Sequence, residues 1–299
     1  MKKIKFFSSY CSEEQIYNNI ISSWGMGSST YKDLLVTKDD DYEYAVLLNR
    51  GICNKQLPRE NVIGFSHEPR MTLGMNDFSQ SYIENSVSEY YISNVSDLPP
   101  PFKEGFSFVC PFEYGKSKNE KYNHVNNMSM ILSLSNFMPG HKMRHDLLKM
   151  LLDSDLDIHF YANGLNRIYS DPRVKEFDWD IFGKPYEDYK YQIVIENIID
   201  NNWSTEKLTN CIIKETIPIY YGCPNIGDWF NMDGIITFND IKDLENIFDY
   251  IDEDYYNSRQ AAIEENYEIA KQFHGDNDVV PRLTRQIIQD VKNNATQRI

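Results

Sequence analysis

The sequence predicts an α/β protein made of two units in tandem, and three observations carry this prediction. Short apolar runs alternate with polar or helical connections along most of the 299 residues, which is typical of open, mostly parallel sheets. The alternation occurs twice, and the polar stretch GKSKNEKYNHVNN (115–127) separates the two halves. Hydrophobic residues make up 41% of the chain and charged residues 25%, as in soluble domains that bury a core.

The first half, residues 1–125, contains strand candidates and one helix candidate. Ile16, Ile20 and Trp24 in EEQIYNNIISSW recur every four residues, as one face of a helix does. The prolines of PPPF (99–102) are expected to break any regular element. The expected strands are KIKFF (3–7), YAVLL (44–48), NVIGF (61–65) and EYYIS (89–93).

The second half, residues 126–299, repeats this alternation. Pro218 cannot donate in a central ladder, so its strand is expected to begin at or after it. The last helices are expected to pack back on the first domain. The expected strands are MSMILSLS (128–135), LDIHFYA (156–162), YQIVIEN (191–197), TIPIYYG (216–222) and GIITF (234–238). The expected helices are KMRHDLLKMLLDS (142–154), with Met143, Leu147, Met150 and Leu151 on one face, and Ser204 to about Glu215.

Charge and cysteine usage exclude several functions. The net charge of −15 and pI of about 4.8 argue against binding to nucleic acid or anionic membranes, so any anionic ligand needs locally placed cations. No apolar run approaches 18 residues, and MKKIKFFSSY is a poor signal peptide. Five cysteines without a CxxC pair indicate reduced thiols in a reducing compartment. The oligomeric state is not determined by the sequence.

The stretch IENIIDNNWSTEKL combines the features of a ligand site. A strand delivers Glu196 and Asn197 at its carboxyl end, and Ser204 or Thr205 can cap the helix that follows. Glu206 and Lys207 then lie in the first turn, where free N–H groups and the helix dipole attract phosphate. The lysine adds a full positive charge, and the glutamate is suited to accept hydrogen bonds from ribose hydroxyls. The simpler alternative is a solvated helix end.

The segment IENIIDNNWSTEKLTNCIIKETIPIYYGCPN, preceded by FGKPYEDYKYQ (182–192) and continued by IGDWF, resembles a known signature. It is similar to FENxxxxxYxTEKLxxxxxxxxIPIYxG, the donor-binding motif of family 10 glycosyltransferases, the α-1,3/1,4-fucosyltransferases. The resemblance is dense over 182–240, collinear from about 128, and thin over 1–125. It implies a GT-B fold of two facing Rossmann-like domains with a cleft between them. Residues 1–125 would bind the glycan acceptor, and residues 126–299 the nucleotide sugar.

The resemblance also assigns donor-binding residues. Asn197, Glu206 and Lys207 match positions that contact the nucleotide sugar, and Trp203 stands where an aromatic residue, often Tyr, is usual. Arg144 in SLSNFMPGHKMRHDLL resembles the family's arginine that neutralises the diphosphate, because a guanidinium bonds phosphate oxygens in bidentate fashion. From the residues alone, Arg144 is equally compatible with a surface position.

The catalytic base is predicted in the first half. NVIGFSHEPR (61–70) resembles the family segment whose glutamate deprotonates the acceptor hydroxyl, which implies Glu68 as the base. His67 remains an alternative base, and an ordinary loop carboxylate is the simpler interpretation of Glu68. FSSYCSEEQ (7–15) is expected to touch the acceptor.

No metal or other cofactor is expected, because a base and cations can carry an inverting transfer. The pairs Asp153/Asp155, Asp155/Asp157 and Asp178/Asp180 resemble DxD metal motifs, but an acidic chain produces them by chance. His141 and His145 lack a third ligand.

The expected function is therefore inverting transfer of fucose from GDP-fucose to a glycan hydroxyl, in a cytoplasmic enzyme of bacterial or viral origin without a membrane stem. The alternatives are a GT-B transferase with another nucleotide sugar, a retaining enzyme, or a non-catalytic glycan- or nucleotide-binding protein. Glu196 and Glu206 lie ten positions apart, which disfavours the retaining alternative. The acceptor, the linkage, and the choice between fucose and another GDP-linked hexose are not determined by the sequence.

Overall fold

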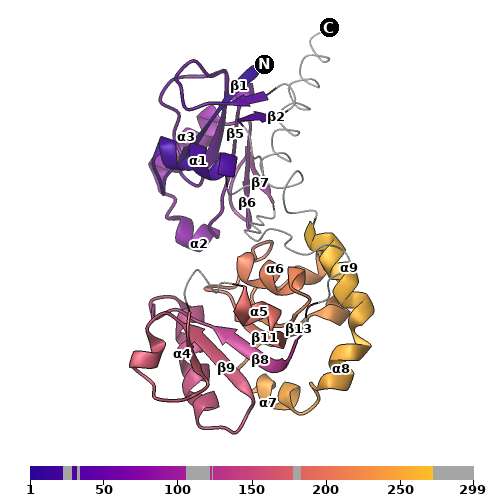
Figure 1. Cartoon of the computed structure of the whole chain (residues 1–299). Helices are drawn as coiled ribbons and strands as arrows, with labels where there is room; N and C mark the ends of the chain where they lie inside the picture. The colour runs from indigo at the N-terminus through magenta and orange to yellow at the C-terminus, as the bar shows by residue number, and fades with distance from the viewer. Residues whose placement is uncertain (23–28, 32–33, 106–121, 123, 178–182, 272–299) are drawn as a thin grey trace. The chain divides into compact units, whose positions relative to one another are not determined.

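The computed structural model describes residues 1–22, 29–31, 34–105, 122, 124–177 and 183–271. The described residues form two α/β units, which are labelled in Figure 1. Residues up to 105, together with Asp200–Trp203, belong to the first unit. Residues 122–199 and 204–271 belong to the second unit. Of the linker predicted at 115–127, only residues 122 and 124–127 are described. The described helices that follow β13 belong to the second unit, and residues 272–299 lie outside the described residues.

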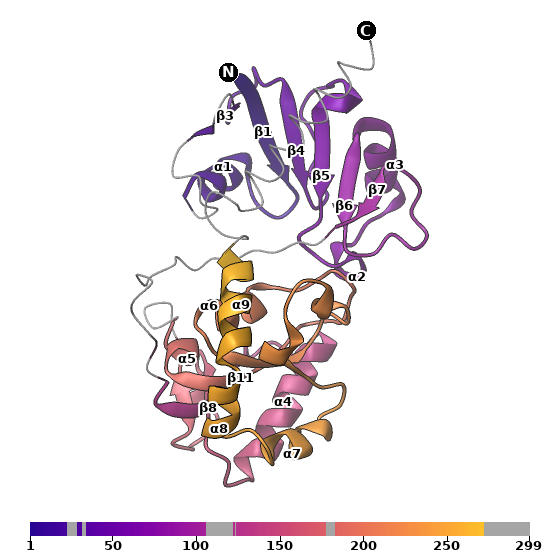
Figure 2. The same cartoon turned by 90° about the vertical axis from the view of Figure 1, so that its right-hand side faces the viewer.

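The first unit is built on a sheet with the strand order β2-β3-β1-β4-β5-β6-β7. Its neighbouring strands are parallel except for β2 and β3, and Figure 2 shows β1, β4, β5 and β6 side by side. The strands are β1 (Lys2–Ser8), β2 (Thr30–Tyr31), β3 (Leu34–Val36), β4 (Tyr44–Leu48), β5 (Val62–Phe65), β6 (Glu89–Ile92) and β7 (Phe102–Glu104).

Helices cover both faces of this sheet because its inner strands are apolar on both sides. Helix α1 (Glu13–Ser22) packs Ile16 and Ile20 against one face. Helices α2 (Arg70–Leu73) and α3 (Asp77–Ser86) pack Leu73 and Ile83 against the other. Four predicted strands and the helix are thus confirmed, although Trp24 lies outside the described residues. The sequence did not predict β2, β3 or β7, and β7 begins directly after the prolines of PPPF.

The second unit is built on a wholly parallel sheet with the order β10-β9-β8-β11-β12-β13. The strands are β8 (Asn126–Ile131), β9 (Ile158–Ala162), β10 (Val174–Glu176), β11 (Tyr189–Ile195), β12 (Ile217–Tyr221) and β13 (Ile236–Thr237). The helices are α4 (Pro139–Leu152), α5 (Lys184–Glu187), α6 (Glu206–Ile213), α7 (Asp243–Phe248), α8 (Glu253–Ser258) and α9 (Gln260–Ala270). Short 3-10 turns connect elements within each unit, at Arg59–Asn61 in the first unit and at Leu165–Arg167, Ile226–Asp228 and Met232–Gly234 in the second.

The alternation of side chains along β11 determines which face of the sheet each residue points to. Ile193 and Ile195 join the core cluster that α4 and α7 cover. Gln192 points to the opposite face, where its Oε1 accepts a hydrogen bond from Cys211 Sγ of α6 at 2.9 Å. Because the period of a strand is two residues, Glu196 continues the face that looks toward α6.

Two details of the sequence prediction are wrong. β12 begins at Ile217, and Pro218 pairs with Gln192 inside it. This is tolerated because β13 pairs with β12 only from Ile219 onward, so at Pro218 the ladder has β11 as its neighbour. Met150 of α4 is 37% exposed, and Leu148 takes the buried position instead.

No helix in the described part of the chain has both the length and the apolar character needed to cross a membrane.

Candidate active site

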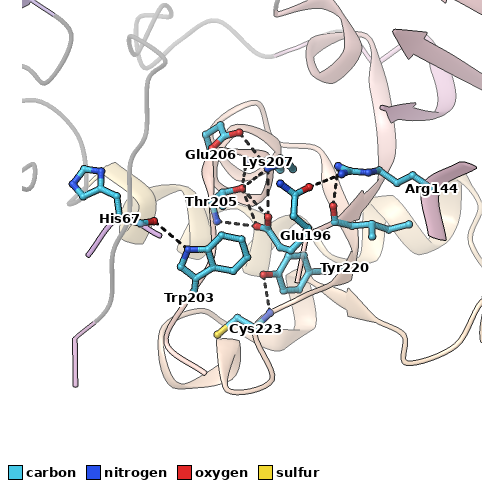
Figure 3. A network of polar contacts seen from close by, with 11 residues as sticks. His67, Arg144, Glu196, Trp203, Thr205, Glu206, Lys207, Tyr220 and Cys223 are labelled. Atoms are coloured by element: carbon cyan, nitrogen blue, oxygen red, sulfur yellow. Dashed lines mark hydrogen bonds and ion pairs between the residues drawn. The ribbon is translucent and has the colours of Figure 1, made fainter. Parts of the chain in front are cut away.

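The carboxyl end of β11 meets the amino ends of two helices in the second unit. Residues Glu196 and Asn197 follow β11, α6 begins with Thr205 as its N-cap, and α4 approaches from the other side. The Thr205 side chain accepts a hydrogen bond from the Lys207 N–H at 3.3 Å. Figure 3 shows the side chains of Glu196, Thr205, Glu206 and Lys207 turned toward one another.

Glu196 is a fully buried carboxylate at the centre of this arrangement, with 0% of its surface exposed. Its Oε1 accepts hydrogen bonds from the Thr205 backbone N–H at 2.8 Å and from Thr205 Oγ1 at 3.0 Å. Its Oε2 lies 2.8 Å from Thr205 Oγ1 and 3.5 Å from Lys207 Nζ. Burying a carboxylate is costly unless its oxygens are paired, and here both are.

Lys207 lies between two carboxylates. Its Nζ donates to Thr205 Oγ1 at 2.9 Å and to Glu206 Oε1 at 3.3 Å, besides its contact with Glu196. Burial by itself lowers the pKa of Lys207, but the charges of Glu196 and Glu206 outweigh it, so the pKa is raised. The side chain remains 27% exposed. Lys207 is therefore a charged group that is both anchored and accessible.

Arg144 is buried beside the same strand end, which excludes the surface position. Only 5% of the residue is exposed. One terminal nitrogen donates to the Ile195 carbonyl at 3.1 Å and the other to Asn197 Oδ1 at 2.5 Å. Its Nε is buried and has no hydrogen-bond partner among the described residues. Burial lowers the pKa of Arg144, against the charges of Glu196 and Glu206.

A glycine allows α4 to reach this strand end. The Gly140 N–H donates to the Asn197 carbonyl at 2.9 Å, and a Cβ on Gly140 would lie 1.8 Å from the Glu196 carbonyl oxygen. Close approach of backbone to backbone requires glycine. The second helix turn then carries Arg144 to the end of β11.

The structure thus brings four predicted donor-binding residues together in one unit: Arg144, Asn197, Glu206 and Lys207. Two cations and two carboxylates lie within this group once Glu196 is counted. The carboxylates differ in exposure, since the Glu206 side chain is 41% exposed and Glu196 is buried. Such a group can bind an anion on its cations and a diol on its exposed carboxylate.

The candidate base lies in the first unit, on the loop between β5 and α2. Asn49 has a left-handed backbone (φ 55°) after β4, and its Oδ1 accepts the N–H groups of His67 at 2.9 Å and Glu68 at 3.3 Å. Ser66 Oγ donates to the Glu68 carbonyl. The Glu68 side chain is exposed, and Thr72 Oγ1 approaches its Oε2 at 3.4 Å.

His67 differs from Glu68 in its surroundings. Its ring stacks on Phe65 with centroids 5.3 Å apart, and burial lowers the pKa of His67 to about 4. Tyr10, in the segment predicted to touch the acceptor, is 49% exposed. Burial raises its pKa to about 12, with smaller contributions from Cys11 and Glu68. Because β1, β4 and β5 are parallel neighbours, the loop that follows β1 and the loop carrying Glu68 lie on the same edge of the first sheet.

Trp203 belongs to the first unit, although it precedes α6 in the chain. Its indole Nε1 donates to the His67 carbonyl at 3.2 Å, and only 4% of the residue is exposed. Asp200 and Asn202 are bonded to Ser93 of the same unit, through Ser93 Oγ at 2.6 Å and the Ser93 carbonyl at 3.1 Å. Stacking of Trp203 on a donor stays a prediction.

No group of three or more His, Cys, Asp or Glu side chains among the described residues is arranged to hold a metal ion. The pair Asp178/Asp180 lies outside the described residues. His141 is buried at the start of α4, where its Nδ1 accepts the Met138 N–H at 3.3 Å.

The chain has the fold of GT-B glycosyltransferases, which is built from two α/β units with largely parallel sheets. A crystal structure of an α1,3-fucosyltransferase with GDP matches over 91% of this chain and 89% of its own, with a TM-score of 0.54 and 12% identity. A second, with GDP-fucose, has a TM-score of 0.55, 12% identity, and coverage of 89% and 82%. At this identity the likeness concerns the fold.

Residues 123–275 match the family model described as "Glycosyltransferase family 10 (fucosyltransferase) C-term". The chain therefore belongs to glycosyltransferase family 10.

Sequence relatives agree with this membership over short segments. An alpha-(1,3)-fucosyltransferase of Helicobacter pylori is 33% identical over 63 residues, which are 21% of this chain and 13% of the relative. Alpha-(1,3)-fucosyltransferase B of Drosophila melanogaster is 32% identical over 102 residues (34% and 21%). A putative fucosyltransferase of Acanthamoeba polyphaga mimivirus is 35% identical over 72 residues (24% and 12%). The matches thus span about a fifth or less of these relatives.

The structure confirms Thr205, one of the two predicted N-caps, as the cap of α6. Sequence reasoning placed Glu196 at the end of its strand without giving it a partner, and it gave no role to Asn49 or Gly140. The two-residue alternation of side chains along β11 could have indicated the orientation of Glu196, because it places this residue on the same face as Gln192 and therefore toward α6. An asparagine directly after a buried strand, followed by Arg50-Gly51, was a signal for the left-handed turn at Asn49.

Proposed function

We propose that this protein transfers fucose from GDP-fucose to a glycan hydroxyl with inversion at the sugar's anomeric carbon. The observation that carries the proposal is the group formed by Arg144, Asn197, Glu206 and Lys207 at the ends of β11, α4 and α6. Family membership and the fold of α1,3-fucosyltransferases support the choice of fucose. The described cysteines are free thiols, which supports a cytoplasmic location.

Donor binding in this proposal requires an exchange of partners at Lys207. Without a ligand, the ammonium donates to Thr205 and forms ion pairs with Glu206 and Glu196. When GDP binds, Glu206 turns to the ribose hydroxyls and Lys207 donates to the diphosphate. Arg144 adds a second positive charge, and Asn197 stays fixed by its bond to the guanidinium. Charge-assisted bonds of this kind are the strong ones.

In the proposed chemical step, Glu68 is the general base. The carboxylate takes the proton of the acceptor hydroxyl while its oxygen attacks the anomeric carbon. The bond from that carbon to the diphosphate breaks, and GDP leaves with the electron pair, stabilised by Lys207 and Arg144. Glu68 is preferred over His67 because its carboxylate is exposed, whereas the imidazole is stacked on Phe65. The proposal needs no metal or other cofactor.

The test is incubation with GDP-fucose and a panel of glycans, followed by measurement of GDP release and of the anomeric configuration of the product by NMR. We expect glycan-dependent release and an inverted product. Transfer from a UDP-sugar, with indifference to GDP-fucose, would contradict the donor assignment. Donor binding without transfer to any glycan would favour a non-catalytic binding protein.

A further inference from the structure

We infer that Glu196 is a positioning residue for the diphosphate: it is the permanent partner that anchors Lys207 while Glu206 is the exchangeable one. The inference rests on the proposed function. Lys207 touches both carboxylates, Glu196 at 3.5 Å and Glu206 at 3.3 Å, so distance does not separate them. Their burial and their other partners do.

Glu206 is free to leave Lys207. Its side chain is 41% exposed, and water or a ribose diol can replace the ammonium as its partner. An ion pair with a solvent-exposed carboxylate contributes less than a fully buried one, so a ligand can displace this one more easily than the pair with Glu196.

Glu196 cannot leave. It is 0% exposed, and Thr205 holds both of its oxygens through one backbone N–H and one hydroxyl. A Cβ on Gly222 would lie 2.6 Å from Glu196 Cγ, so the chain is packed closely against the side chain as well. Separating a buried carboxylate from its partners leaves its charge unpaired, which is strongly unfavourable.

Glu196 also links the lysine to the start of its helix. Thr205 is the N-cap of α6 and receives the Lys207 N–H and the Lys207 ammonium on its hydroxyl. The same hydroxyl donates to Glu196. One carboxylate therefore determines the direction of the cap hydroxyl and the position of the ammonium, which remains 27% exposed toward a ligand.

An opposing effect makes the inference testable by sign. A buried negative charge near a diphosphate repels it, so if Glu196 did no positioning, neutralising it would tighten GDP binding. In Glu196→Gln only one of the two side-chain oxygens remains as an acceptor. The NH₂ group that replaces the other oxygen is directed at Thr205 or at the ammonium. Lys207 would then lose its anchor.

The experiment is calorimetric titration of GDP and of guanosine, which lacks the diphosphate. We expect Glu196→Gln to weaken GDP binding by about 10-fold or more and guanosine binding by less than about twofold. The control is Glu187→Gln, which removes the 2.7 Å ion pair to Lys214 at the opposite end of α6 and should leave both affinities within about twofold. If the glutamine variant fails to fold, Glu196→Asp serves instead, and we expect it to bind GDP more weakly than the unmodified protein with guanosine affinity unchanged.

A double variant separates positioning from general damage. If Glu196 acts through Lys207, Glu196→Gln combined with Lys207→Met binds GDP no more weakly than Lys207→Met alone. Unchanged or tighter GDP binding by Glu196→Gln, equal losses for GDP and guanosine, or additive losses in the double variant would each overturn the inference. Absence of GDP binding by the unmodified protein would instead overturn the proposed function.

Discussion

The loop that carries Glu68 and the strand end that carries Glu196 hold their carboxylates in opposite ways. At Glu68 the backbone is held by Asn49 and Ser66, while the side chain is exposed and is approached by Thr72 Oγ1 at 3.4 Å. At Glu196 the side chain itself is buried and bonded through both oxygens. The first arrangement suits a group that must receive a proton. The second suits a group that must keep another residue in place.

Removing the exposed carboxylate should produce the largest effect. We expect Glu68→Gln to lower kcat by about 100- to 10,000-fold, because general-base catalysis contributes that much, and to leave the Kd for GDP unchanged. Steady-state kinetics and calorimetry measure the two quantities. Glu104→Gln, an exposed glutamate at the end of β7, is the control. Equal losses in kcat and GDP affinity would erase the proposed division between the two carboxylates.

Crowding the strand end should damage the second unit. Gly140→Ala places a Cβ 1.8 Å from the Glu196 carbonyl oxygen, and overpacking against backbone costs about 3 kcal/mol of unfolding free energy. Denaturant unfolding measures this, and GDP affinity should fall as well, because α4 carries Arg144. In Gly227→Ala the new Cβ meets the flexible Met232 side chain at 3.1 Å, so the cost should stay below about 1 kcal/mol. Similar stabilities for the two variants would show that α4 has room to shift.

Loosening the base loop should have a smaller effect. Asn49→Ala removes the acceptor of two N–H groups and puts alanine at φ 55°, which should cost about 1–3 kcal/mol. The kcat for transfer should fall by about 10-fold with GDP affinity intact. Asn49→Asp keeps the acceptor and should retain most of the activity. A loss of GDP affinity in Asn49→Ala would mean that this loop does not act on the chemical step alone.

The smallest expected effect is a change in how the free energy of unfolding depends on pH, through His67. Because the pKa of His67 is lowered from 6.5 to about 4 in the folded state, the unfolded chain binds more protons between these values. The stabilisation is present above pH 6.5 and is lost as pH falls toward 4, with a slope of at most about 1.4 kcal/mol per pH unit. His67→Gln should reduce the slope of unfolding free energy against pH in this window. An unchanged slope would show that His67 is not buried in neutral form.

The sequence predicted the architecture well because buried parallel strands and amphipathic helices leave strong periodic patterns. It named four residues that the structure brings together, because they lie on one continuous motif or on the helix that precedes it; their binding of a donor stays a prediction. The role of Glu196 could not be predicted from the sequence, because it depends on how β11 pairs with its neighbours and on the burial of the Glu196 side chain. A sequence motif contains neither. Trp203 belongs with the first unit through a hydrogen bond to a residue 136 positions away, which no local pattern contains. Pro218 was misplaced because tolerance of a proline depends on where the neighbouring strand begins.

Binding of GDP tests the central claim most directly, namely that the end of β11 and the first turn of α6 hold a diphosphate. Calorimetry should show that the protein binds GDP more tightly than guanosine, and that Lys207→Met weakens GDP binding by about 10- to 100-fold with guanosine affinity unchanged. Lys149→Met, an exposed lysine on α4, should match the unmodified protein. Equal affinities for GDP and guanosine, or a Lys207→Met variant that binds GDP normally, would contradict the claim.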